Sequence, residues 1–257
     1  MKLVLAFGFF VTAAIYASVG FGGGSTYTAL LAVSGTSYIL IPIISLLCNI
    51  AVVSGNSWRY WRGGFFTRSH NWPLIILSVP AAFIGGMVNV SEIVFIFLLS
   101  VALLIAGLRM LLSGPVSGTM DVRASERRKG LGALIGGCIG FYSGIVGIGG
   151  GIFLAPILYR LRWGQAQNIA ASCSFFILVN SGAGLIGQLI KSAGRTFHAD
   201  MMSYWPLILA VLIGGTLGNK LSLSFFKPKH LRRLTAILIL GVAIRLIIKW
   251  VAMLSWI

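Results

Sequence analysis

Long apolar runs, separated by short polar or glycine-rich stretches, fill almost the whole chain. A helix needs about 20 consecutive apolar residues to cross a bilayer, and the sequence offers about eight such runs. They cover residues 3–18 continuing into 25–33, 38–53, 72–90, 93–112, 131–147 continuing into 152–158, 166–190, 204–221 and 234–254. Short alternating segments, which a membrane β-barrel would require, do not occur. The pattern predicts an all-α polytopic membrane protein with about eight transmembrane helices.

Two glycine clusters interrupt these runs, GFGGGS at residues 20–25 and GIGGGI at residues 147–152. Each glycine in a helix costs about 1 kcal/mol relative to alanine, so three in a row are expected to unwind the helix. Inside a membrane the freed N–H and C=O groups must be buried in protein or line a watery cavity. Broken helices at corresponding positions of two halves are typical of transporter binding sites. We therefore expect both clusters to be helix breaks whose free N–H groups attract an anion.

The clusters belong to a longer repeat. Matching positions lie 127 to 133 residues apart: Ser45 with Ser172, Ser54 with Ser181, and WPLI at 72–75 with WPLI at 205–208. We predict a first transmembrane repeat over residues 1–112, a linker over 113–130 and a second repeat over 131–257. The linker carries Arg127, Arg128 and Lys129, and short basic loops stay in the cytoplasm, so we place it there.

The sequence leaves two arrangements of the repeats open. Four crossings in each half favour parallel repeats, whereas the distribution of basic residues favours inverted ones. An additional re-entrant segment at a glycine cluster would reconcile the two.

A second glycine pattern precedes the second cluster, with a glycine at every fourth position: Gly132, Gly136, Gly140 and Gly144. Small residues at this spacing lie on one face of a helix and allow a neighbouring helix to approach closely. We interpret this pattern as a packing surface rather than as part of the binding site.

Composition and charge agree with a membrane location. The 257 residues are 58% hydrophobic and only 9% charged, whereas soluble domains carry about 25% charged residues. The net charge of +16 comes from basic residues at the ends of apolar runs, which indicates contact with the lipid bilayer rather than with nucleic acid. Cys48, Cys138 and Cys173 lack metal-site spacing and are expected to be small core residues.

Polar residues within the apolar runs are the remaining candidates for a site. We predict a substrate site built from the glycine clusters and buried neutral donors: Gly22, Gly23, Gly24, Ser25, Asn49, Gly149, Gly150, Gly151, Ser172, Asn180, Ser181 and Gln188. Hydroxyl and amide donors hold an oxyanion without a buried charge. Basic residues after the second and sixth runs would either attract the anion or anchor the helices at the membrane surface: Arg59, Arg62, Lys191 and Arg195.

The segment GIGGG at 147–151, followed by Pro156, resembles the glycine-rich signature of the TauE/SafE family. That family comprises sulfite exporters and related permeases for sulfonates and other organosulfur anions. The length, the two-repeat layout and the basic central linker are also similar. The first half departs from the signature, because Ala29 stands where the second half has Pro156. The resemblance implies a transporter and leaves the anion undefined.

The chain lacks residues that other functions would need. Its four acidic residues lie in or near loops, which disfavours a cation transporter. The sequence has no phosphate-binding loop and no metal-binding motif, so we expect neither an enzyme, a cofactor nor a metal site. We predict a multi-pass secondary transporter of the cell (inner) membrane that moves a small anion such as sulfite, a sulfonate or a carboxylate. The alternatives are a divalent metal exporter and a non-transporting membrane assembly factor; assembly into a homo-oligomer is left open.

Overall fold

The computed structural model describes residues 2–18, 20–66, 68–112, 129–161, 166–192, 203–220 and 228–254. Over these ranges the chain forms helices and no strands, which confirms the all-α prediction there. The helices are α1 (Lys2–Ser18), α2 (Gly24–Val33), α3 (Leu40–Arg62), α4 (Arg68–Met87), α5 (Glu92–Leu112), α7 (Lys129–Val146), α8 (Gly151–Arg160), α9 (Ala166–Ser192), α11 (Trp205–Lys220) and α12 (Pro228–Leu254). Residues 113–128 of the predicted linker lie outside the described ranges.

Within the described ranges, three helical segments are long and apolar enough to cross a membrane: Leu40–Arg62, Glu92–Arg109 and Gln167–Ser192. Shorter apolar helices cover Leu3–Ser18, Asn71–Met87 and Gly130–Val146. Many large apolar side chains on these helices are exposed, Leu134 at 64% and Ile248 at 63% among them. An exposed apolar surface of this kind suits contact with lipid rather than with water.

Both glycine clusters break the helix, as expected. The first lies between Ser18 at the end of α1 and Gly24 at the start of α2, and the second lies between α7 and α8. The first glycine of each cluster has a left-handed backbone, with φ of +82° at Gly20 and +80° at Gly147. Glycine adopts this conformation without steric cost, whereas other residues rarely do.

The chain reverses direction at each break instead of continuing as one interrupted helix. Gly20 lies against Tyr60 near the end of α3, and Gly24 lies against Asn49 near its middle. Helix α2 therefore runs antiparallel to α3. Helices α1 and α3 both run parallel to α11, so α2 is antiparallel to α1 as well. The second break repeats this geometry with α7, α8 and α9. A re-entrant ten-residue helix thus follows each glycine cluster. Such a helix is the additional segment that would reconcile the number of crossings in each half with the distribution of basic residues.

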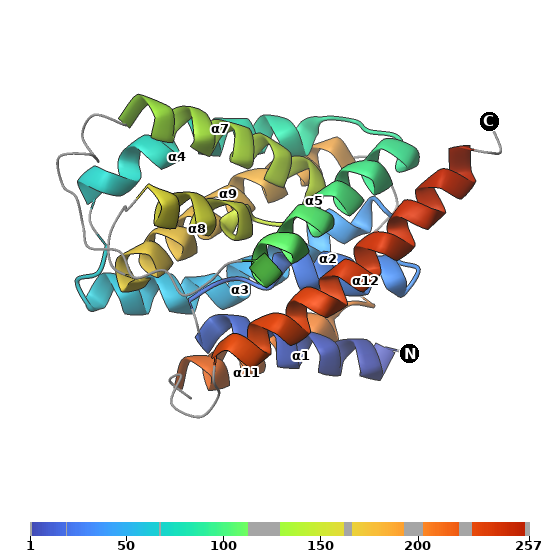
Figure 1. The fold of residues 1–257 in the computed structure, drawn as a ribbon, viewed down its shortest axis with the longest axis horizontal. Helices are drawn as coiled ribbons and strands as arrows, with labels where there is room; N and C mark the ends of the chain where they lie inside the picture. Colours follow the sequence, from blue (N-terminus) through green and yellow to red (C-terminus); the bar gives the residue numbers. More distant parts are fainter. Residues whose placement is uncertain are drawn as a thin grey trace.

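Two pairs of packed helices, one member from each predicted repeat, run in opposite directions. Helices α3 and α9 are antiparallel, because Leu46 contacts Gly184 while Phe66 contacts Phe175. Helices α5 and α12 are antiparallel too, since Lys249 bonds Glu92 near the start of α5. The described ends of the chain, in α1 and α12, lie on the same side of the molecule (Figure 1). We call this side the termini end, and the side where α5 finishes and α7 begins the linker end.

The glycines spaced by four residues bring α7 against α4. A Cβ atom on Gly136, Gly140 or Gly144 would overlap the backbone carbonyl oxygens of α4. The two backbones are therefore in direct contact along one edge of the bundle, where Figure 1 shows α4 and α7 side by side. The interpretation of this pattern as a packing surface is confirmed at these three positions.

We expect Gly140→Ala to destabilise the protein by about 1–3 kcal/mol, because its methyl group has no room against Ser78 of α4. Gly137→Ala is the matched control, since its added Cβ would meet Leu77 at the ordinary distances of 3.5 Å from Cβ and 3.8 Å from the carbonyl oxygen. Thermal denaturation in detergent, followed by size-exclusion chromatography, measures both variants. Equal midpoints for the two would contradict direct backbone packing.

Candidate functional site

The two helix breaks meet at the side chain of Asn49, in the middle of α3. Asn49 is fully buried, and its Nδ2 donates a hydrogen bond to the carbonyl oxygen of Ile148, 3.1 Å away. A Cβ atom on Gly22 would lie 2.6 Å from Asn49 Oδ1, and one on Gly149 would lie 2.8 Å from Nδ2. One amide therefore touches both breaks, which lie 127 positions apart in the sequence.

A polar stripe on α3 accompanies the breaks. Pro42, Asn49 and Asn56 are seven residues apart and so share one face of the helix. Asn56 Nδ2 donates to the carbonyl oxygen of Phe21 at 3.4 Å, and Ser45 Oγ donates to that of Gly24 at 3.3 Å. On this face of α3, Asn56 and Ser45 thus pair with carbonyl groups at the first break, whereas Asn49 pairs with one at the second.

Helix α9 carries a matching stripe with the same spacing: Ser174, Ser181 and Gln188, all of them fully buried. Ser174 donates to the carbonyl oxygen of Gly20 at the first break. Gln188 Nε2 donates to the carbonyl oxygens of Gly144 and Ile145, at 2.8 and 3.2 Å, in the last turn of α7. Ser181 Oγ would lie 3.0 Å from a Cβ on Gly149. Helices α3 and α9 therefore enclose both breaks from opposite sides.

Buried polar atoms without a protein partner remain around the breaks. Among the described residues they include Asn49 Oδ1, Ser181 Oγ and Gln188 Oε1, and Asn180 Oδ1 is a further such atom on α9. A buried polar group costs free energy unless it is hydrogen-bonded, so such atoms point to a water or a ligand. Ser181 is the most informative of them, because its hydroxyl can donate and it lies beside the second break.

The start of each re-entrant helix lies in this buried centre. Helix α2 begins at Gly24 beside Asn49, and α8 begins at Gly151 beside Ile177. Neither N-cap, Gly23 or Gly150, has a side chain that could bond the first N–H groups. The two helices run outward in opposite directions, so the positive ends of both helix dipoles converge on the centre. Two uncapped helix N-termini favour a negative charge between them.

The remaining predicted residues do not all reach the breaks through their side chains. Ser172 and Asn180 bond the backbone of their own helix, at Asn168 and Phe176. A Cβ on Gly150 or Gly151 would meet apolar side chains of α7 and α9, and one on Gly23 would meet Tyr27 and Thr12. Ser25 is buried in the first turn of α2. The repeat-matched serines Ser45 and Ser172 therefore make different contacts.

Three side chains that bond the breaks are absent from the predicted set: Ser45, Asn56 and Ser174. The signal that would have found them is a spacing of four or seven residues from Asn49 or Ser181, which places each on the same helix face as a predicted residue.

The basic candidates differ in their surroundings. Arg59 Nη1 donates to the carbonyl oxygen of Asn219 at 2.8 Å, which ties α3 to α11 at the linker end. Arg62 lies over the Trp58 ring at 4.7 Å, as expected for an anchor at the membrane surface. Lys191 lies at the termini end, where its Nζ donates to the carbonyl oxygen of Val88 at 3.4 Å. Arg195 lies outside the described residues.

A helical membrane protein whose re-entrant half-helices meet in its core has the architecture of a membrane transporter. Residues 4–246 match the family described as "Sulfite exporter TauE/SafE". The chain belongs to this family, which confirms the resemblance seen in the sequence.

Known relatives of the chain are also named as membrane transporters. The chain is 32% identical over 244 residues to a Sinorhizobium fredii protein named "Probable membrane transporter protein y4hK", covering 95% of this chain and 97% of that protein. It is 24% identical over 213 residues to "Probable membrane transporter protein YunE" of Bacillus subtilis, covering 79% and 75% of the two chains. No solved structure matches the chain.

We expect Asn49→Leu to destabilise the protein by about 1–3 kcal/mol, because the Ile148 carbonyl loses its buried donor. Ser54→Ala is the control, since Ser54 is exposed and bonds only its own helix at Ala51. The readout is the thermal midpoint in detergent. An Asn49→Leu midpoint equal to that of Ser54→Ala would show that the amide does not hold the breaks together.

Proposed function

We propose that the protein is a secondary transporter for a small oxyanion, which binds between the two helix breaks. The observation that carries this proposal is the convergence of two uncapped half-helix N-termini on a buried centre, with the unpartnered Ser181 hydroxyl beside them. Backbone N–H groups and a hydroxyl are donors, and donors at positive dipole ends suit the oxygens of an anion. Sulfite, sulfonates and small carboxylates have this chemistry.

The arrangement of the halves supports a transport mechanism. The antiparallel pairs α3 with α9 and α5 with α12 are what an inverted repeat would produce. In inverted-repeat transporters, the substrate lies between the repeats near the midplane and the repeats rock around it. Here α2 and α8 both begin at the buried centre; α2 runs from it toward the termini end and α8 toward the linker end. Rocking would expose the same centre first to one side and then to the other.

The alternative functions have weaker support. A divalent metal exporter needs anionic or imidazole ligands, whereas the polar side chains around the breaks are neutral amides and hydroxyls. An assembly factor needs no uncapped helix ends in a buried centre. A role without catalysis also agrees with the names of the relatives, which are all membrane transporters.

Proteoliposomes that contain only the purified chain test this proposal. We expect saturable uptake of at least one anion among sulfite, sulfoacetate, taurine, thiosulfate and acetate, and no uptake of Zn²⁺ or Mn²⁺. Ser181→Ala should raise the half-saturation constant by about 10- to 150-fold, because a hydrogen bond to a charged group is worth about 1.5–3 kcal/mol. Ser172→Ala should leave the constant unchanged, since Ser172 lies on the same helix and bonds only Asn168. Absence of anion uptake, or metal uptake instead, would overturn the proposal.

Charge distribution supports one orientation in the cell membrane. Basic residues in the turns nearest the linker end are Arg59, Arg62, Arg68, Arg109, Lys129, Arg160, Lys220, Lys229, Arg232 and Arg233. Those in the helices toward the termini end are Lys2, Lys191, Arg245 and Lys249. By the positive-inside rule, we place the linker end in the cytoplasm and the termini end outside.

Single cysteines in a cysteine-free background test this orientation. Ser37→Cys lies in the exposed loop between α2 and α3 at the termini end, and Trp61→Cys lies at the linker end, where Trp61 is 63% exposed. A membrane-impermeant maleimide should label the first in intact cells and the second only after lysis. The reverse pattern would place the linker end outside.

A further inference from the structure

A pocket of about 320 Å³ opens at the termini end of the bundle. It is formed by the loop before α3, the connection between α4 and α5, and the last turn of α9. Its walls combine apolar side chains with hydroxyl, amide and ammonium groups, among them Tyr38, Pro42, Asn89 and Lys191. The volume is large enough for a small oxyanion together with several water molecules.

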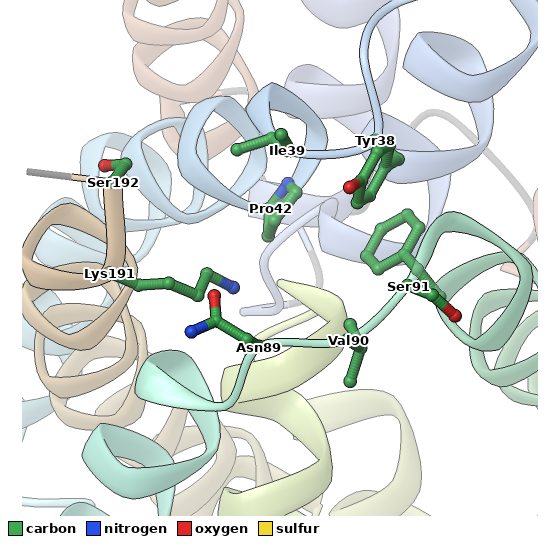
Figure 2. Close-up of a pocket in the computed structure, with 9 residues that line it drawn as sticks. Tyr38, Ile39, Pro42, Asn89, Val90, Ser91, Lys191 and Ser192 are labelled. Carbon is green, nitrogen blue, oxygen red and sulfur yellow. The ribbon is translucent and has the colours of Figure 1, made fainter. Parts of the chain in front are cut away.

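Lys191 carries the charge among the described residues that line the pocket. Figure 2 shows its side chain reaching across the pocket beside the amide of Asn89, with Tyr38 on the opposite wall. The ammonium carries three N–H donors, one of which bonds the Val88 carbonyl at 3.4 Å. Among the described residues that line the pocket there is no aspartate or glutamate. The walls therefore favour an anion over a cation.

The pocket is in direct contact with the second helix break through Pro42. A Cβ atom on Gly147 would lie 2.6 Å from Pro42 Cβ and 3.0 Å from its carbonyl oxygen. Asn49 lies two turns after Pro42 on the same face of α3, and it bonds Ile148. The segment of the second break, at Gly147 and Ile148, thus lies between the pocket and the buried centre.

Helix α9 makes the same connection from the other side. Lys191 follows Gln188 by three residues and therefore lies on the face that carries Gln188 and Ser181. Gln188 bonds the last turn of α7, which leads into the break. The polar stripes of both enclosing helices end at this pocket.

We propose that the pocket is a second anion-binding site, an outer vestibule in which Lys191 binds the oxyanion before it passes the second break. The proposal rests on the proposed transport function and names the residue that attracts the substrate. An ammonium on a flexible stem suits this task, because it can hold an anion weakly and then release it toward the N–H groups of the centre. Binding at the vestibule raises the local anion concentration and so lowers the concentration needed for half-maximal transport.

The test uses proteoliposomes of the full chain with labelled sulfite, or with whichever of the five anions the wild type transports. We expect Lys191→Gln to raise the half-saturation constant five- to tenfold, with a maximal rate within twofold of wild type. The half-saturation constant of wild type should also rise with ionic strength, and this rise should be lost in Lys191→Gln. Lys191→Arg keeps the charge and should retain both properties.

Lys249→Gln is the matched control, because Lys249 has the same charge at the same end of the bundle but lies on the surface beside Glu92, outside the residues that line the pocket. It should behave as wild type. If Lys191→Gln does not insert into liposomes, Asn89→Asp tests the same site, since it adds a carboxylate beside Lys191 at an exposed position. It should raise the half-saturation constant at least as strongly.

The outcomes separate the two proposals. Wild-type protein that transports none of the five anions overturns the proposed function. Wild-type transport combined with equal constants for Lys191→Gln and Lys249→Gln, or with an unchanged constant for Asn89→Asp, overturns the vestibule and leaves the transporter intact.

Discussion

The whole arrangement depends on satisfying backbone carbonyl groups that two helix breaks release inside an apolar bundle. Lipid offers these groups no hydrogen bond, so the protein must supply the donors. Asn49, Asn56, Ser174 and Gln188 do so, each from α3 or α9 and each to a carbonyl of a break or of the helix turn before it. This requirement explains why both breaks lie between α3 and α9, the two helices that carry the donors.

The same requirement determines what is left for a substrate. Gln188 Nε2 already donates to two carbonyl oxygens, and Asn49 Nδ2 and Asn56 Nδ2 each donate to one, so the amides have few N–H groups left for an anion. The main further donors in the proposed site are the uncapped N–H groups of α2 and α8 and the hydroxyl of Ser181. In this proposed site the protein binds an anion mainly with its backbone, and no buried charge has to be stabilised when the site is empty.

Sequence reasoning could predict the breaks but not their geometry. Consecutive glycines weaken any helix, so both interruptions follow from composition alone. The reversal of the chain depends on where the break packs, with Gly20 against Tyr60 and Gly147 against Pro42, and no periodicity encodes such contacts. The repeat pairs Ser45 with Ser172, but Ser45 bonds Gly24 at the first break and Ser172 bonds Asn168 of its own helix. Equal positions in the repeat therefore do not have equal neighbours. The polar stripes were readable, since Ser174, Ser181 and Gln188 recur every seven residues.

The two breaks also differ in a way that bears on access to the centre. At the linker end the ring of Tyr60 covers the first break, with Cε2 2.7 Å from where a Cβ of Gly20 would lie. At the termini end Pro42 backs the second break and at the same time lines an open pocket. Both residues belong to α3, but Tyr60 covers the first break with its side chain, which packs against Phe65, whereas Pro42 contacts the second break with its backbone and can move only with α3. In the proposed mechanism, opening toward the linker end can therefore begin with one side chain, while opening toward the termini end requires a shift of α3 against the second repeat.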